Sequence, residues 1–288
     1  MRMLILTLVI TLGLVICDAF LINNVRLRPE IFLLEQEDTS NHNWNHEPFD
    51  FSSRIGWDKF YKEGKSFEVQ SLENLEYEWH SHIPHSVIVN VISPTIDAAS
   101  KYYNLQHNNT STEGNKLPSI LMIGTGNSAL PRILHDAFDT PVKVTCLDYS
   151  PVCIDMIRSM YSEFCPNMDF ILGDATRLKE AVNNEEYDVI VDKGLLDALM
   201  CNEGFELSKL IAGLDQVLTR HEWGTSILIC FELSSSNQES MIELTDCDER
   251  QNPKLFWDFD VNVEGSDNGR ATFNLARRRK LKLPTLTK

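Results

Sequence analysis

The sequence has no closely spaced cysteine pair. Its seven cysteines form no CxxC pair and no spacing typical of zinc ligands, and they stand at positions 17, 146, 153, 165, 201, 230 and 247. An odd number of cysteines scattered through apolar segments indicates free thiols in the core. A disulfide framework is therefore excluded, and we expect no metal site.

Positive charge is also scarce. The 26 Lys and Arg residues stand against 42 Asp and Glu, which gives a formal net charge of −16. Such a surface repels phosphate chains, so nucleic acid is not expected as a partner, whereas a basic protein surface would be attracted. Hydrophobic residues make up 43% of the 288 residues, enough for a sizeable core, which excludes wholesale disorder.

The apolar run behind Arg2, residues 3–17, is shorter than the roughly 20 residues that a membrane-spanning helix needs. A basic start, this run and the small Ala19 beyond it are typical of a secretory signal. We expect residues 1–22 to be a signal peptide or an uncleaved signal anchor, which would attach the chain to a membrane. Asp18-Ala19-Phe20 resembles the leader junction of proteins imported into complex plastids. The expected location is the secretory pathway or an endomembrane-derived organelle such as a complex plastid, not the plain cytosol.

The rest of the chain divides by composition. Residues 23–56 are polar and without periodicity, and are predicted to be a linker. A folded domain is predicted from 57 to 276, in which 57–117 form an N-terminal helical cap and loop. Residues 277–288 form a basic tail.

Within the domain, short apolar runs alternate with amphipathic stretches. Strands are predicted at 119–123, 142–147, 168–172, 187–191 and 225–233, and helices at 128–138, 151–164 and 206–218. Apolar strands separated by helices predict a parallel sheet covered on both faces. Two further strands, 256–263 and 270–275, are joined by a glycine-containing turn. The predicted fold class is therefore α/β, a Rossmann-like doubly wound seven-stranded sheet, mostly parallel with a terminal antiparallel hairpin.

A glycine turn follows the first strand. Gly124 and Gly126 stand where a chain must turn sharply and approach a ligand without a Cβ in the way. Asp148 ends the next strand 22 residues after Gly126, where a carboxylate can accept hydrogen bonds from a ribose diol. Together they predict an adenosine-containing ligand. Both NAD and S-adenosylmethionine fit this pattern.

Two more carboxylates follow predicted strands. Asp174 ends the third strand, where it can reach an adenine amine, and Asp192 ends the fourth, where we expect it to face the crevice. No Tyr-x-x-x-Lys pair of a dehydrogenase is present. The terminal hairpin is typical of methyltransferases and not of dinucleotide domains, so S-adenosylmethionine is favoured.

Four segments carry a family resemblance, namely 120–128, 147–150, 173–174 and 187–199, the last containing Asp-Lys-Gly-Leu-Leu-Asp-Ala-Leu. They resemble the class I methyltransferases that include the elongation factor 1-alpha lysine methyltransferases and the citrate synthase lysine methyltransferase. Upstream, Trp57-Asp-Lys-Phe-Tyr61 and Tyr77-Glu-Trp79 resemble tryptophan-containing motifs of that family, with a longer spacer between them.

The resemblance implies S-adenosyl-L-methionine as the cofactor. With Gly126 of the turn added, the implied cofactor-binding residues are Trp57, Tyr61, Trp79, Gly124, Gly126, Asp148, Tyr149, Asp174, Ala175 and Lys193. It also implies a lysine side chain of a protein as the methyl acceptor. The chain departs from the family at Thr125, which replaces a cysteine, and at His80, which replaces an aromatic residue and puts the substrate wall in doubt.

Several side chains keep two interpretations. The three aromatic residues of the implied set are either core residues of a helical cap or cover the cofactor, where ring faces attract a sulfonium. Asp197 is read as a helix N-terminal carboxylate, and His80, His82 and His85 as solvated or capping residues. No catalytic residue is identified. A small-molecule methyltransferase, an aminopropyltransferase, an NAD-dependent oxidoreductase and a non-catalytic scaffold remain alternatives.

Overall fold

The computed structural model describes residues 50–51, 53–64, 76–109, 116–202, 204–246, 255–261 and 271–278. The predicted leader, the predicted linker up to residue 49 and residues 279–288 of the predicted tail lie outside these ranges. The described strands are β1 Ser119–Ile123, β2 Lys143–Asp148, β3 Met168–Leu172, β4 Val189–Lys193, β5 Thr225–Phe231, β6 Phe256–Asp258 and β7 Ala271–Arg277.

These strands form one sheet in the order β3-β2-β1-β4-β5-β7-β6. Strands β1 to β5 pair in parallel, whereas β7 is antiparallel to both β5 and β6. The strand order reverses between β1 and β4, and the carboxyl ends of parallel strands at such a reversal leave a crevice for ligands. The predicted Rossmann-like sheet with its antiparallel hairpin is confirmed.

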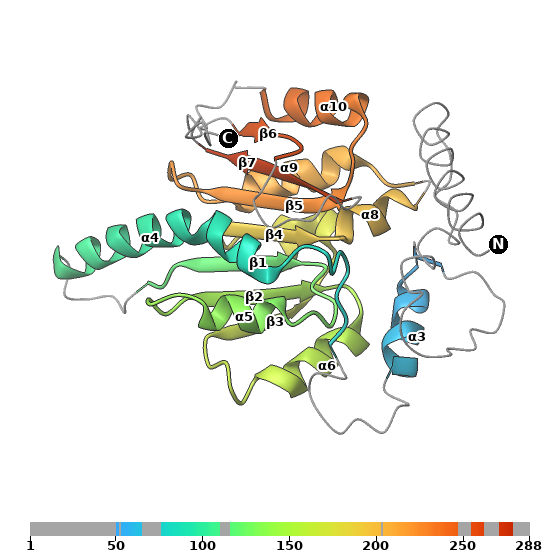
Figure 1. Cartoon of the computed structure of the whole chain (residues 1–288), viewed down its shortest axis with the longest axis horizontal. Coiled ribbons are helices and arrows are strands. Elements are labelled where there is room, and N and C mark those ends of the chain that lie inside the picture. The colour runs from blue at the N-terminus through green and yellow to red at the C-terminus, as the bar shows by residue number, and fades with distance from the viewer. Residues whose placement is uncertain are drawn as a thin grey trace, which may run out of the picture.

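Helices cover both faces of this sheet (Figure 1). They are α3 Arg54–Gly64, α4 His85–Asn109, α5 Leu130–Asp136, α6 Pro151–Tyr161, the short 3-10 helix η3 Ala175–Arg177, α7 Leu178–Ala181, α8 Leu195–Met200, α9 Leu207–Val217 and α10 Ser235–Asp246. One apolar cluster joins α3, α4, α5 and α6 to one face, and a second joins α7 to α10 to the other. None of the described helices is long and apolar enough to cross a membrane.

Strand β1 is apolar from Ile120 to Ile123 because both faces of the sheet are covered there. In β1, Ile120 and Met122 point into the first cluster, and Leu121 and Ile123 into the second. All five β1 residues are buried. This alternation over two cores is what a parallel strand between helix layers requires.

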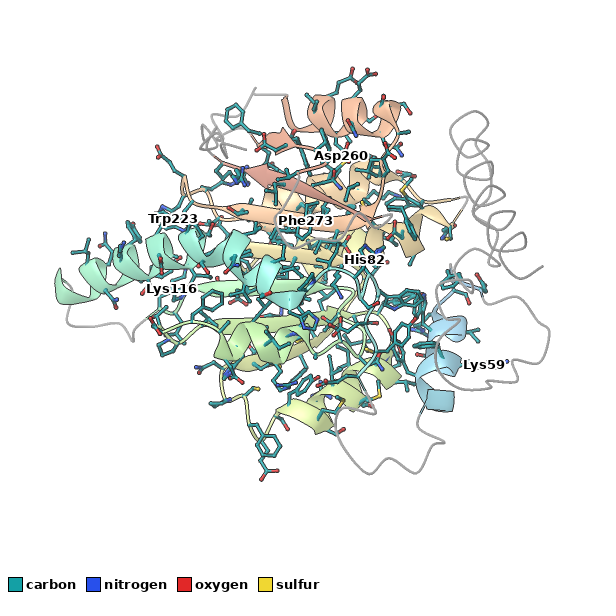
Figure 2. The ribbon with its side chains drawn as sticks, in the orientation of Figure 1. Lys59, His82, Lys116, Trp223, Asp260 and Phe273 are labelled. Carbon is teal, nitrogen blue, oxygen red and sulfur yellow. The ribbon has the colours of Figure 1, made fainter. Side chains whose placement is uncertain are left out.

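At the amino ends of the parallel strands, opposite the crevice, polar side chains bond to Asp188. The hydroxyl of Tyr103 and the indole nitrogen of Trp223 each donate to Asp188 Oδ1 at 2.9 Å. Figure 2 shows Trp223 at one end of the sheet and Lys59 of α3 at the other. Helix α3 therefore lies at the carboxyl end, beside the crevice.

Some boundaries differ from those predicted. Strand β4 begins and ends two residues later than predicted. Asp192 and Lys193 are therefore strand residues. Helix α10 was not predicted, because among its residues only Met241 is buried in the apolar core. A helix with so little apolar periodicity gives no sequence signal.

The described fold extends beyond the predicted domain 57–276 at both ends. Phe51 is buried and α3 begins at Arg54, both inside the predicted linker. Strand β7 runs to Arg277, and the buried Arg278 donates to the carbonyl oxygens of Leu218 and Thr219 at 3.0 and 3.1 Å. These two arginines belong to the fold and not to a solvated tail.

Candidate active site

A cavity of about 340 Å³ lies at the carboxyl edge of the sheet. The ten predicted cofactor-binding residues all line it: Trp57, Tyr61, Trp79, Gly124, Gly126, Asp148, Tyr149, Asp174, Ala175 and Lys193. They come from the N-terminal segment, from β4 and from the segments that follow β1, β2 and β3. The fold therefore brings together residues that are up to 136 positions apart in the sequence.

The glycine turn follows β1 and has the conformation that the motif predicts. Gly124 and Gly126 have φ of 58° and 59°, a region that side chains with a Cβ rarely adopt. A Cβ on Gly124 would lie 2.7 Å from the Cβ of Leu195. The turn therefore needs glycine both for its backbone and for close packing against α8.

Asp148 ends β2 and fixes this turn. Its Oδ2 accepts a hydrogen bond from Gly126 N at 3.0 Å, and its Oδ1 accepts one from Ser150 N at 2.9 Å. Burial raises the pKa of the carboxyl group, and hydrogen bonds from Ser150, Gly126, Cys153 and Tyr149 oppose that shift. An ionised carboxylate only accepts hydrogen bonds, so a ligand diol at this position would donate to it.

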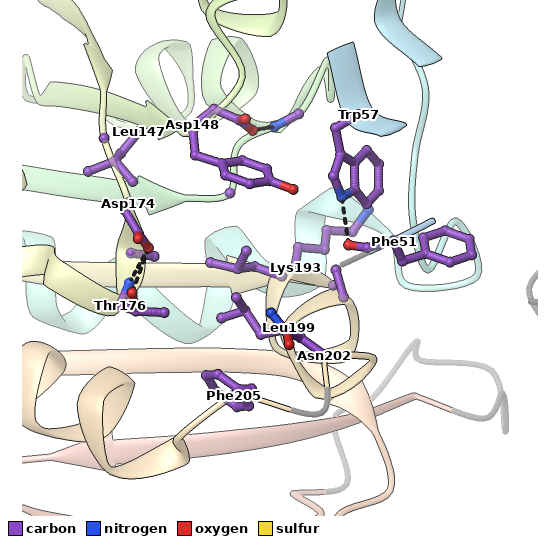
Figure 3. Close-up of a pocket in the computed structure, with 18 of the residues that line it drawn as sticks. Phe51, Trp57, Leu147, Asp148, Asp174, Thr176, Lys193, Leu199, Asn202 and Phe205 are labelled. Atoms are coloured by element: carbon purple, nitrogen blue, oxygen red, sulfur yellow. Dashed lines mark hydrogen bonds between the residues drawn. The ribbon is translucent and has the colours of Figure 1, made fainter. Parts of the chain in front are cut away.

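Asp174 follows β3 and begins η3. Its Oδ1 accepts bonds from the backbone nitrogen and the hydroxyl of Thr176, each at 2.8 Å. Ala175 beside it is buried. In Figure 3, Asp174 and Thr176 lie at one end of the cavity, and Phe51 and Trp57 lie at the other, with Lys193 between them.

The end of the cavity at which Phe51 and Trp57 lie has an aromatic wall. Trp57 stacks on Tyr61 with ring centroids 5.9 Å apart and meets Trp79 edge to face at 5.8 Å. Phe51 packs edge to face on Trp57 at 5.8 Å, and Trp57 Nε1 donates to its carbonyl oxygen at 3.0 Å. Trp57 and Tyr61 are buried in the core cluster and also line the cavity, so core packing and a place beside a ligand are compatible for these two residues.

Lys193 ends β4 and is buried, with 4% of its side chain exposed. Its Nζ donates to Glu78 Oε2 at 2.7 Å. Burial lowers the pKa of Lys193, and the charge of Glu78 opposes this shift. A buried ammonium group therefore stands in the cavity wall next to the glycine turn.

Of the two carboxylates on either side of the Lys-Gly turn, Asp192 differs from the expectation. It is fully buried and accepts bonds from Leu195 N and Leu196 N at 2.7 and 3.0 Å, so it caps α8 and does not line the cavity. Asp197 lies in the first turn of α8, as predicted. Its carboxylate also bonds His80 Nε2 at 2.8 Å and accepts from Phe231 N at 2.9 Å.

Of the three histidines read as solvated or capping residues, His80 is buried, with 5% exposed and φ of 52°. His82 and His85 are partly exposed, and His85 Nε2 lies 3.1 Å from Glu78 Oε1 at the start of α4. Among the described residues, no group of three or more histidine, cysteine or acidic side chains is placed to hold a metal ion.

The cavity wall contains residues outside the predicted cofactor-binding set. They include Phe51 and, around α8 and the start of α9, Leu195, Ala198, Leu199, Asn202, Phe205, Glu206 and Lys209. Those of α8 belong to the 187–199 segment of the family resemblance, which gave them no role. Most of the set is apolar, and a sequence pattern cannot distinguish such residues from core residues. For the residues of α8, the usable signal was their position directly after β4, whose carboxyl end faces the crevice.

Comparison with known proteins agrees with this geometry. Residues 120–219 match the family described as "Methyltransferase domain". The chain therefore contains a class I S-adenosylmethionine-dependent methyltransferase domain, and S-adenosyl-L-methionine is the methyl donor of that domain.

Two curated relatives share parts of this region. The chain is 35% identical over 85 residues to the eEF1A lysine and N-terminal methyltransferase homolog of Drosophila melanogaster, covering 29% of this chain and 12% of that protein. It is 28% identical over 151 residues to the mitochondrial citrate synthase-lysine N-methyltransferase CSKMT of Danio rerio, covering 50% and 53%. The chain thus spans at most about half the length of these relatives.

Among solved structures, fibrillarin of Aeropyrum pernix with natively bound S-adenosyl-L-methionine matches with a TM-score of 0.41 at 14% identity. The match covers 55% of this chain and 66% of that one.

Proposed function

We propose that this protein binds S-adenosylmethionine in the cavity and transfers its methyl group to a lysine side chain of a protein. The observation that carries the cofactor proposal is the bond between Gly126 N and Asp148 Oδ2 at the strand reversal, because it presents a buried carboxylate where a ribose would lie. The lysine target is supported by the sequence resemblance and by the two relatives, which are named as lysine methyltransferases.

The chemistry of the wall fits each part of the cofactor. The carboxylate of Asp148 suits the ribose hydroxyls, and Asp174 with Ala175 suits the adenine. The glycine turn leaves space for a ligand main chain, and the ammonium group of Lys193, between the two ends of the cavity, suits a carboxylate. The rings of Trp57 and Trp79 suit a sulfonium cation.

The acceptor would enter at the aromatic end. Phe51 and Trp57 form one side there, and Asn202 lies opposite them across Lys193 (Figure 3). The apolar rings at this end suit the aliphatic part of a lysine side chain. The net charge of −16 favours approach of a basic protein surface.

When bound, the cofactor supplies a methyl group on a sulfonium sulfur; the amine nitrogen of the acceptor forms the new bond to carbon while the sulfur keeps the electron pair of the old one. The aromatic wall would exclude water and hold the reacting groups in line. Asp192 is occupied in capping α8, so we do not assign it a role in removing the proton of the amine. A neutral amine must therefore arrive from solvent or lose its proton at the entrance.

Two experiments test the proposal. Calorimetry with S-adenosylmethionine, S-adenosylhomocysteine, decarboxylated S-adenosylmethionine and NAD should show binding of the first two. Tighter binding of the decarboxylated form would instead indicate aminopropyl transfer, and binding of NAD alone an oxidoreductase.

The acceptor is tested in cells that lack the protein. Quantitative mass spectrometry of methylated lysine residues should show loss of one or a few sites. If no lysine site changes and a methylated metabolite disappears, the target is a small molecule. If neither changes and a labelled methyl donor labels nothing in lysate, the chain is a scaffold.

We further propose that the chain enters the secretory pathway or an endomembrane-derived organelle, with membrane attachment if the leader is retained. The support is the apolar run behind Arg2, which lies outside the described residues. Fluorescent fusions with and without residues 1–22 should differ in location. Identical diffuse cytosolic signals would contradict this proposal.

A further inference from the structure

Residues 76–80, here called the strap, cross the carboxyl edge of the sheet beside the cavity. Tyr77 N donates to the carbonyl oxygen of Asn127 at 3.2 Å. The rings of Tyr77 and Trp79 pack edge to face at 5.2 Å, and Tyr77 also packs on Phe60 of α3 at 5.8 Å. Tyr77 and Trp79 of the strap thus pack with the rings of the aromatic wall.

Glu76, Glu78 and His80 instead bond to residues of the sheet and of the helices that cover it. Glu76 accepts from the hydroxyl of Tyr161 at 2.9 Å and from Arg132 at 3.3 Å, on α6 and α5. His80 bonds Asp197 of α8. Glu78 lies between them and does not line the cavity itself.

The carboxylate of Glu78 connects two sides of the cavity. Its Oε1 accepts from Ala129 N at 2.7 Å, and the hydroxyl of Ser128 lies 2.8 and 2.9 Å from its two oxygens. Its Oε2 accepts from Lys193 Nζ at 2.7 Å. Ser128 and Ala129 directly follow the glycine turn, whereas Lys193 ends β4.

The first of these contacts adds to a local helix cap. At the start of α5, Ser128 Oγ accepts a hydrogen bond from Leu130 N at 3.0 Å. The N–H group of the N-cap residue Ala129 bonds instead to Glu78, which is 51 positions away. Glu78 thus joins the strap to the exit of the glycine turn, both through Ala129 N and through the hydroxyl of Ser128.

The second contact balances a buried charge. Lys193 has 4% and Glu78 20% of its side chain exposed. Burial would raise the pKa of Glu78, but His85 and Lys193 outweigh it and lower the pKa to about 2. Among the described residues, Glu78 is the carboxylate that pairs with Lys193, and an unpaired buried ammonium group is costly.

We propose that Glu78 is a positioning residue for cofactor binding. It sets the distance between the glycine turn and the ammonium group of Lys193, which are the two groups proposed to hold the amino-acid end of S-adenosylmethionine. It acts through Ala129 and Lys193 and touches no ligand. This inference rests on the proposed function.

The test compares Glu78→Gln with Glu76→Gln, a matched change two residues away on the same strap. In Glu78→Gln the amide oxygen of the new side chain can still accept from Ala129 N, but the side chain no longer balances the charge of Lys193. We expect the Kd for S-adenosylhomocysteine, measured by calorimetry, to rise at least about tenfold in Glu78→Gln. In Glu76→Gln it should stay within about twofold, although both variants melt at lower temperature because each loses charge-assisted hydrogen bonds.

A second comparison separates positioning from general stability. In a Lys193→Met background, Glu78→Gln should have little further effect on Kd, because its action passes through the ammonium group. Should Glu78→Gln fail to fold, Glu78→Asp keeps the charge and shortens the reach by one methylene, and its Kd should rise by a smaller factor.

Three results would overturn the inference: an unchanged Kd in Glu78→Gln, an equal rise in Glu76→Gln, or a wild-type Kd in Glu78→Asp when Glu78→Gln does not fold. Failure of the wild-type protein to bind S-adenosylhomocysteine would overturn the proposed function and this inference together. The wild-type measurement therefore distinguishes the two failures.

Discussion

The two ends of the cavity are held in place by different kinds of contact. At the end formed by β1, β2 and β3, backbone groups fix the geometry: Gly126 N bonds Asp148, and Thr176 N bonds Asp174. At the aromatic end, ring contacts among Trp57, Tyr61 and Trp79 hold the wall together.

This difference has a consequence for recognition. Hydrogen bonds from the sheet edge are directional and belong to the rigid core, so that end can demand particular ligand groups. Ring packing is less directional and tolerates related shapes. We therefore expect the sheet edge to determine which cofactor binds. We expect the aromatic wall to distinguish a charged from an uncharged sulfur and to select the acceptor.

The largest effect is expected at the sheet edge, from Asp148→Ala. Loss of two charge-assisted hydrogen bonds to a ribose, each worth about 1.5–3 kcal/mol, should raise the Kd for S-adenosylhomocysteine at least about 100-fold. Gly126 N and Ser150 N lose their acceptor, so the free energy of unfolding falls as well. Asp169→Ala, on the exposed side of β3, is the control. Calorimetry showing unchanged affinity would remove the cofactor assignment.

The next effect concerns Glu78, which bonds both Ala129 N after the glycine turn and Lys193 Nζ at the end of β4. Its pKa is lowered from 4.5 to about 2 in the folded protein. This carboxylate therefore contributes stability above pH 4.5, roughly 3 kcal/mol, that is lost as the pH falls through about 2. In Glu78→Gln, denaturant unfolding at a series of pH values should show a flatter acid limb. Identical acid limbs in variant and wild type would contradict the pairing with Lys193.

A smaller effect is expected from Gly124→Ala. A side chain at φ of 58°, with its Cβ 2.7 Å from Leu195, should lower the free energy of unfolding by about 2 kcal/mol. Gly204→Ala is a matched control, since Gly204 also lines the cavity but its Cβ would meet only Asn202 Oδ1, at 3.4 Å. The free energy of unfolding is measured by urea denaturation. An equal decrease in the two variants would mean that the turn at position 124 does not require glycine.

The smallest effect should come from the aromatic wall and should depend on ligand charge. Trp57→Leu removes a ring that can attract a sulfonium, worth about 0.5–2 kcal/mol. The Kd for S-adenosylmethionine should rise by a factor of about 3 to 30 relative to that for S-adenosylhomocysteine, whose thioether sulfur carries no charge. Phe60→Leu changes a ring of the same cluster that does not line the cavity, and should leave the ratio unchanged. Equal weakening for both ligands would limit Trp57 to a packing role.

The contrast between the two ends also explains which parts of the site could be read from sequence. The glycine turn, Asp148 and Asp174 are local motifs at strand ends, because the backbone conformation of a strand–turn–helix unit depends on a few adjacent residues. Trp57, Tyr61 and Trp79 were indicated only by resemblance, and their periodicity is also that of a core. Phe51 was assigned to a linker because a single buried aromatic residue in a polar stretch has no local signature.

By itself, the sequence determined the α/β class, the order of the elements, the terminal hairpin and the carboxylates at the ends of β2 and β3. These follow from apolar periodicity and from residues next to each other in the chain. Tertiary structure alone decided that Asp192 caps α8, that Asp197 bonds His80, and that Glu78 holds Lys193 across 115 positions. Each of these depends on which partner a buried charge finds when distant segments pack, because burial makes an unpaired charge costly whereas sequence distance costs little.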